Sequence, residues 1–205
     1  PFTNIEFQST GVGIRTHEQL FKMSSKNRIT TFSLSLSSFN DEVNAEYNGT
    51  PVKRMVKLDQ LCKAIKESGM TLRISVNMTN DFDMYMRTPW AFFKECRYRF
   101  NADQVTIREL YGIPDTPEGM WIERNGASPK TIYALEQYVI QHGNFLENMG
   151  HGRQRYSVYG MSVIIDNDCM KTKEKTETEN DYRYVILRPN AKLYSRWDDR
   201  GSLIF

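Results

Sequence analysis

The stretch from Ile29 to Glu42, ITTFSLSLSSFNDE, most constrains what this chain can fold into. Small hydroxyl and large apolar side chains alternate along it, which gives a polar and an apolar face: Thr31, Ser33, Ser35 and Ser37 against Phe32, Leu34 and Leu36. A period of two over this length predicts a β-strand. With helices on its apolar face and the acidic loop at its end, the strand suits the wall of a βα barrel that holds a ligand at its mouth. A half-exposed strand of an antiparallel sheet gives the same pattern.

Three further segments favour the barrel. Strands with one apolar and one polar face are predicted at 4–11, 71–80 and 104–111. Helices are predicted between them at 16–26, at 57–68 and from Thr88-Pro89 onward. The order β-α-β-α-β-α-β implies parallel strands joined by right-handed crossovers. We therefore expect an α/β fold in which residues 1–125 form a partial parallel βα barrel.

Beyond residue 125 the pattern changes. Ser128-Pro129 begins a longer helix, predicted to be interrupted near Gly143 and to stop near Gly150. A strand is predicted at 156–166, and the alternating charges of 171–179 predict a solvated loop. Pro189-Asn190-Ala191 predicts a hairpin turn between 182–188 and 192–196, with a third strand at 202–205. Residues 126–205 are thus expected to form a C-terminal helix and a small antiparallel β appendage.

Composition excludes several classes of protein. Of the 205 residues, 40% are hydrophobic and 25% are charged, which argues against global disorder. The net charge of +2 gives no reason to expect a nucleic-acid partner, and no apolar run is long enough to span a membrane. The three cysteines, Cys62, Cys96 and Cys169, show no metal-ligand spacing. We expect reduced thiols, a cytoplasmic location and no metal bound by this chain.

The order of these segments resembles the radical S-adenosylmethionine (SAM) superfamily. SLSLSSFNDEVNAEYNG (33–49) is similar to the fourth strand and acidic loop of that family. The segments that follow, at 57–80 and 102–112, resemble its next helix and its fifth and sixth strands, and NIEFQSTGVG (4–13) resembles its third strand. Residues 183–204 resemble a hairpin found near the C-terminus of many members.

The chain departs from the family at its most specific motifs. Radical SAM enzymes bind a [4Fe-4S] cluster through CxxxCxxC after the first strand, and a Gly-Gly-Glu-Pro-type turn holds the SAM amino group after the second. Neither motif is present here. If the match begins at the third strand, both motifs are expected upstream of Pro1, and the chain would be the C-terminal portion of such an enzyme. The chain also begins without Met, which agrees with that expectation.

The resemblance implies a site at the C-terminal ends of the strands. There SAM, cleaved by the cluster, would yield a radical that takes a hydrogen atom from a small-molecule or peptide substrate that the sequence does not identify. Ser35 and Ser37 match positions that contact SAM, and Ser75 or Asn77 would add a second polar contact. Arg73 could meet a carboxylate. The remaining expected contacts lie at the ends of the strands predicted at 4–11 and 104–111: Thr10, Gly11, Leu110 and Tyr111.

Two other hypotheses remain open from the sequence. In the first, the chain is a cluster-free barrel-like module that binds a ligand or partner without chemistry. In the second, it is a metal-free hydrolase or lyase whose acid and base groups come from Glu6, Asp41 and Glu109. Specificity in any of these cases is expected in the loops 40–56 and 81–87 and in residues 113–205.

Overall fold

The computed structural model describes residues 3–14, 16–150, 153–166, 186–187, 190–195, 201 and 203–204. The chain divides into two compact units, Pro1–Asp168 and Cys169–Phe205. The first unit contains the predicted strands and helices up to residue 166. Within the described ranges, no helix combines the length and the apolar character needed to cross a bilayer.

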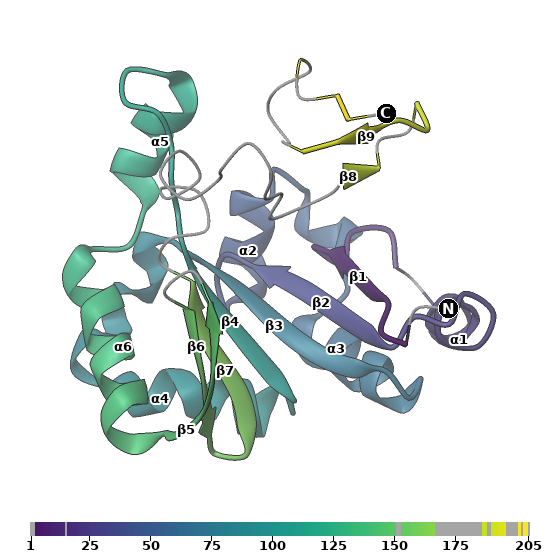
Figure 1. Ribbon diagram of the computed structural model, residues 1–205, viewed down its shortest axis with the longest axis horizontal. Helices are drawn as coiled ribbons and strands as arrows, with labels where there is room; N and C mark the ends of the chain where they lie inside the picture. The colour runs from purple at the N-terminus through teal and green to yellow at the C-terminus, as the bar shows by residue number, and fades with distance from the viewer. Residues whose placement is uncertain are drawn as a thin grey trace. The chain divides into compact units, whose positions relative to one another are not determined.

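The first unit is built on a seven-stranded sheet with the order β1-β2-β3-β4-β7-β6-β5 (Figure 1). Its strands are β1 (Glu6–Ser9), β2 (Thr31–Leu36), β3 (Thr71–Met78), β4 (Gln104–Glu109), β5 (Asn144–Gly150), β6 (Arg153–Val158) and β7 (Met161–Asp166). Strands β1 to β4 are parallel neighbours in sequence order, and β7 lies parallel to β4. The α/β class and the parallel order are therefore confirmed. The sheet is open, with β1 and β5 as its edges, so it is not a closed barrel.

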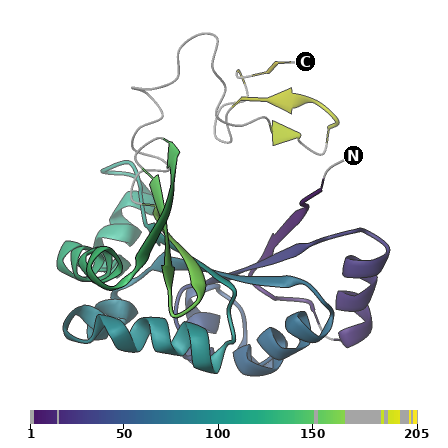
Figure 2. The ribbon, with the colours of Figure 1, turned by 60° about the horizontal axis from the view of Figure 1, so that its bottom comes forward.

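Helices lie along one face of the curved sheet (Figure 2). They are α1 (His17–Ser25), α2 (Asp41–Tyr47), α3 (Leu58–Glu67), α4 (Pro89–Lys94), α5 (Pro117–Asn125) and α6 (Pro129–His142), with shorter helical turns at Val52–Arg54, Asn80–Arg87 and Glu95–Arg99. The predicted capping box of α1 is present. The Gln19 backbone N–H donates to Thr16 Oγ1 at 3.2 Å, and the Thr16 N–H donates to Gln19 Oε1 at 3.1 Å.

Strand alternation places the core on the helical side of the sheet. Phe32, Leu34 and Leu36 of β2 are fully buried, as are Leu72, Ile74, Val76 and Met78 of β3. Rings from the loop after β2 and from the helical layer extend this core around Phe39, which contacts Phe82, Tyr85, Phe92 and Phe100. The opposite face of β1 to β4 carries polar side chains, as the alternation predicts.

Three segments differ from the sequence prediction. Residues 41–47, predicted as part of a polar loop, form α2, because Asn40 Oδ1 accepts from the Glu42 and Val43 N–H groups. The helix predicted to reach Gly150 ends at His142, and residues 144–150 form β5. Residues 156–166 are two strands rather than one, because Tyr159 and Gly160 take positive φ angles of 50° and 77° and turn the chain.

These differences change the picture of the C-terminal part. Elements α6, β5, β6 and β7 belong to the first unit and extend the main sheet, whereas the sequence pattern predicted an appendage. The second unit contains β8 (Ile186–Leu187) and β9 (Leu193–Tyr194), which pair antiparallel and confirm the predicted hairpin. A bridge joins Tyr194 to Leu203, where a third strand was predicted. The predicted charged loop at 171–179 lies outside the described residues.

Candidate functional site

Two rows of residues cross the polar face of the sheet in register. The first row runs from β2 to β6 and consists of Ser33, Arg73, Gln104, Ser162 and Ser157. The second row lies nearer the C-terminal ends of the parallel strands and consists of Ser35, Ser75, Thr106, Ile164 and Arg155. One step further along, Asn77 pairs with Arg108. The structure thus brings together Ser35, Ser75 and Asn77, which the sequence predicted as site residues.

Two buried hydroxyl groups on this face are unsatisfied. Ser33 and Ser75 are fully buried, and the Oγ atoms of both have no hydrogen-bond partner among the described residues. Ser35 differs, because its Oγ accepts from Gln8 Nε2 at 3.1 Å. A buried hydroxyl without a partner costs about 1–3 kcal/mol. Such groups are therefore candidates for binding a polar ligand.

Arg73 does not have the free guanidinium group that the prediction requires. Its Nη1 is ion-paired with Glu6, and its Nε donates to Gln104 Oε1 at 2.8 Å. Arg73 is also the third residue of β3, so it lies nearer the N-terminal end of the strand than Ser75 and Asn77 do. These contacts already satisfy its charge within the protein.

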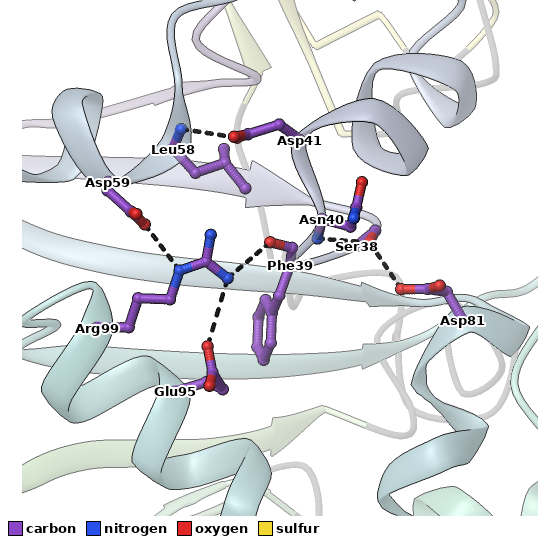
Figure 3. A network of polar contacts seen from close by, with 9 residues as sticks. All are labelled: Ser38, Phe39, Asn40, Asp41, Leu58, Asp59, Asp81, Glu95 and Arg99. Carbon is purple, nitrogen blue, oxygen red and sulfur yellow. Dashed lines mark hydrogen bonds and ion pairs between the residues drawn. The ribbon is translucent and has the colours of Figure 1, made fainter.

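The loops that follow β2 and β3 are held together by buried polar contacts. The Ser37 backbone N–H donates to Asn44 Oδ1 at 2.9 Å, and Thr79 Oγ1 donates to the Ser37 carbonyl at 2.6 Å. Ser38 Oγ donates to Asp81 Oδ2 at 2.6 Å (Figure 3). The hydrogen bonds of its backbone N–H and carbonyl therefore fix the position of Ser37.

The other predicted site residues lie at the ends of β1 and β4. Thr10 and Gly11 follow β1, where the Gly11 N–H donates to Ser9 Oγ at 3.0 Å. Leu110 and Tyr111 follow β4. Leu110 lines a cavity of about 490 Å³ beneath α5, whereas Tyr111 is exposed. All four belong to the C-terminal edge of the parallel strands.

A second cavity, of about 590 Å³, lies between the loop after β2 and the helical layer. Its lining includes Phe39, Asp41, Tyr85 and Arg99. Figure 3 shows the contacts of Arg99 beside this cavity: its Nε donates to Asp59 Oδ1 at 2.8 Å, and its Nη1 donates to the Phe39 carbonyl at 2.9 Å. No role for this cavity was predicted from the sequence.

The charges around this second cavity are largely balanced. Burial alone would lower the pKa of Arg99, but its contacts with Asp59 and Glu95 outweigh burial and raise that pKa. Asp41 Oδ1 accepts from the Leu58 N–H at 2.8 Å and so caps α3. Burial raises the pKa of Tyr85 to about 12, so its hydroxyl stays protonated at neutral pH. The network therefore joins the loop after β2 to α3 and to the helical turn at Glu95–Arg99.

The three carboxylates proposed for acid–base chemistry do not converge. Glu6 lies on the polar face of β1, where it pairs with Arg73. Glu109 pairs in register with Met78 and therefore lies on the opposite, helical face. Asp41 caps α3. Sequence alone could not separate these positions, because each is an acidic residue near a strand end.

The described residues do not fit an iron–sulfur cluster. No group of three His, Cys, Asp or Glu residues converges among them. Cys62 and Cys96 are buried in the core, where burial raises the pKa of Cys62 to about 12 and holds the pKa of Cys96 well above its usual value. Both are therefore protonated core thiols, and no third ligand group converges with them among the described residues.

Three arginines on the polar face were not among the predicted site residues. Arg108 belongs to the alternating segment of β4, and the same alternation would have indicated it. Arg153 and Arg155 lie on β6, whose first residues were not predicted as a strand. All three are half-buried, and their Nε atoms have no acceptor among the described residues.

Comparison with known proteins gives a limited result. No protein-family model matches the chain, and no curated protein matches it in sequence. A radical SAM methyltransferase from Sphaerobacter thermophilus is similar in structure, with a TM-score of 0.43 and 14% sequence identity. The match covers 67% of this chain and 37% of the other, so the chain spans little more than a third of that protein's length. A likeness of this size carries no inference about activity.

Proposed function

We propose that this chain is the C-terminal part of a radical SAM enzyme and that SAM binds on the polar face at the C-terminal ends of β2, β3 and β4. Ser35, Ser37 and Asn77 would supply hydroxyl and amide contacts, and the backbone near Leu110 would lie beside the adenine. The observation that carries the proposal is the buried hydroxyl of Ser75, which has no partner within the described ranges and lies between Ser35 and Thr106 on the face opposite the helical layer. A polar ligand would supply the missing hydrogen bonds.

The cluster that would act on SAM needs ligands outside the described residues. We therefore assign to this chain only the binding and orientation of SAM and the exclusion of water, and no step of the radical reaction. Arg73 is not included among the SAM contacts, because Glu6 and Gln104 already occupy its guanidinium group.

The first test is calorimetric titration of the folded chain with SAM. Saturable binding is expected. Asn77→Ala should weaken it about 2- to 12-fold, the equivalent of one hydrogen bond. The matched control is Asn27→Ala, which removes an exposed amide that lies just before β2. Absence of saturable binding to a chain with native circular dichroism would overturn the proposal.

The second test concerns the radical chemistry. The coding sequence upstream of the Pro1 codon is read for a CxxxCxxC motif in the same frame. If the motif is present, the full-length protein should bind iron and sulfide on reconstitution. A complete reading frame without the motif, together with SAM binding, would instead favour a cluster-free ligand-binding module.

A further inference from the structure

Three arginines lie close to the predicted SAM contacts without enough acceptors to satisfy them. Arg108, Arg153 and Arg155 project from the polar face of β4 and β6. Each is half-buried, and each Nε is shielded from solvent with no hydrogen-bond partner among the described residues. A guanidinium group taken out of water without an acceptor is costly. An anion at this place would remove that cost.

The register places these side chains near one another. Arg155 pairs with Ile164 of β7, which pairs with Thr106 of β4, and Arg108 lies two residues beyond Thr106. One strand therefore separates Arg108 from Arg155, and with the two-residue offset along the strands their backbones lie about 12 Å apart. The polar face is the concave side of the curved sheet, opposite the helices (Figure 2). Side chains that project from a concave face converge. Arginine is long enough for two such groups to bind one oxyanion.

The remaining charge on this face differs from strand to strand. Arg73 is satisfied by Glu6 and Gln104. Arg155 has one ion pair, from Nη2 to Glu147 Oε1 at 2.8 Å. Arg108 lies in register between Asn77 of β3 and Asp166 of β7. The three arginines therefore outnumber the two acidic residues that lie beside them, Glu147 and Asp166, so one positive charge is in excess near Asn77.

We infer that Arg108, assisted by Arg153 and Arg155, binds a carboxylate or phosphate group of the substrate. The assignment of this anion to a substrate rests on the proposed function. The anion site itself does not depend on SAM. The planar guanidinium group can donate two parallel hydrogen bonds to either oxyanion. Bound in this way, the anion would place the substrate next to Asn77 on the polar face.

The test is titration of the folded chain with inorganic phosphate and, separately, with succinate at constant ionic strength. One of the two probes should bind saturably. The probe that binds shows whether the site takes a phosphate or a carboxylate group. Arg108→Gln should weaken that binding about tenfold or more, the loss of a charge-assisted contact. Arg87→Gln is the control, because Arg87 is exposed and follows β3 outside the sheet. Absence of binding by both probes, or equal losses in the two variants, would overturn the inference.

A competition experiment separates this site from the carboxylate site of SAM. The successful probe is titrated again in the presence of SAM and of methylthioadenosine, which lacks the amino-acid carboxylate. Unchanged affinity for the probe in both cases supports a separate substrate site. If SAM displaces the probe but methylthioadenosine does not, the arginines hold SAM itself and the inference is wrong. Probe binding without any SAM binding would instead refute the proposed function alone.

Discussion

Gly11 gives the sharpest test of how the predicted site is built. It follows β1, is buried, and has a φ angle of +81°, in the left-handed region. A Cβ atom added to it would lie 2.4 Å from Leu61 Cδ2 and 3.4 Å from Leu34 Cδ1. Gly11→Ala therefore introduces both backbone strain and a steric overlap with α3. The residue was predicted to bind a ligand, but these distances also give it a packing role.

The cost of this substitution can be estimated from its two parts. An alanine in the left-handed region costs about 1–2 kcal/mol. Overpacking against Leu61 costs about a further 1–3 kcal/mol. The free energy of unfolding should therefore fall by about 2–5 kcal/mol in Gly11→Ala. Gly13 has a φ angle of +90° and no heavy atom within 4 Å of the position that a Cβ atom would take, so Gly13→Ala should show the backbone cost alone.

The assay is urea unfolding followed by the fluorescence of the three tryptophans of the chain. The difference between the two glycine variants isolates the overlap, because each gains the same methyl group. Combining Gly11→Ala with Leu61→Ala should destabilise the protein by about 1–3 kcal/mol less than the sum of the single variants, since the new methyl group then has room. Equal stabilities of the two glycine variants, or additive effects in the double variant, would refute this account.

Two further predictions concern α3 and the core thiols. Asp41→Ala removes the cap on the Leu58 N–H and should lower the free energy of unfolding by about 1 kcal/mol. Glu42→Ala, at an exposed neighbouring position, should leave the free energy of unfolding unchanged. Equal effects of the two substitutions in urea unfolding would contradict the capping role. Because burial raises the pKa of Cys62 from 9.0 to about 12, the folded protein retains a proton that the unfolded chain loses, so stability should decline as pH rises through that range. In a Cys169→Ser background, Cys62 and Cys96 should resist a disulfide reagent near neutral pH until urea unfolds the protein; labelling of the native state would show that they are accessible.

Alternation along the strands was sufficient to predict the first half of the fold. In β2 and β3 every second residue is apolar, and each of these residues is buried in the structure. Such strands, with helices on one face only, have a clear period of two. The same period was enough to place Ser35, Ser75 and Asn77 together on the polar face.

The prediction failed where the period is broken. Strand β5 pairs with β6 through register shifts between Phe145 and Glu147 and between Asn148 and Gly150. Each irregularity changes which face the next side chain occupies, so no alternation can be seen in the sequence. Helix α2 was missed for a different reason. Its seven residues are too few for helical periodicity, and its start depends on a cap from Asn40.

The site was only partly predictable because ion pairs depend on register. Arg73 and Glu6 meet across β2, from strands that are not neighbours, and no local pattern connects them. Their pairing removes Arg73 as an anion-binding group. Arg108 lies in register between Asn77 of β3 and Asp166 of β7, and these neighbours could be recognised only once the register of β4 was known.

The separation of the two faces of β2 and β3 also bears on how this protein can diverge in evolution. Under the proposed function, neighbouring positions on one strand are subject to different selection: for stability of the core at Leu34 and Ile74, and for ligand binding at Ser35 and Ser75. Point substitutions on the polar face can therefore change specificity while the core is preserved. A single-residue insertion within either strand would exchange the faces of every residue beyond it, so both functions would be lost together. Lineages of this fold should therefore accumulate substitutions on the polar face of these strands, and length changes only in the loops.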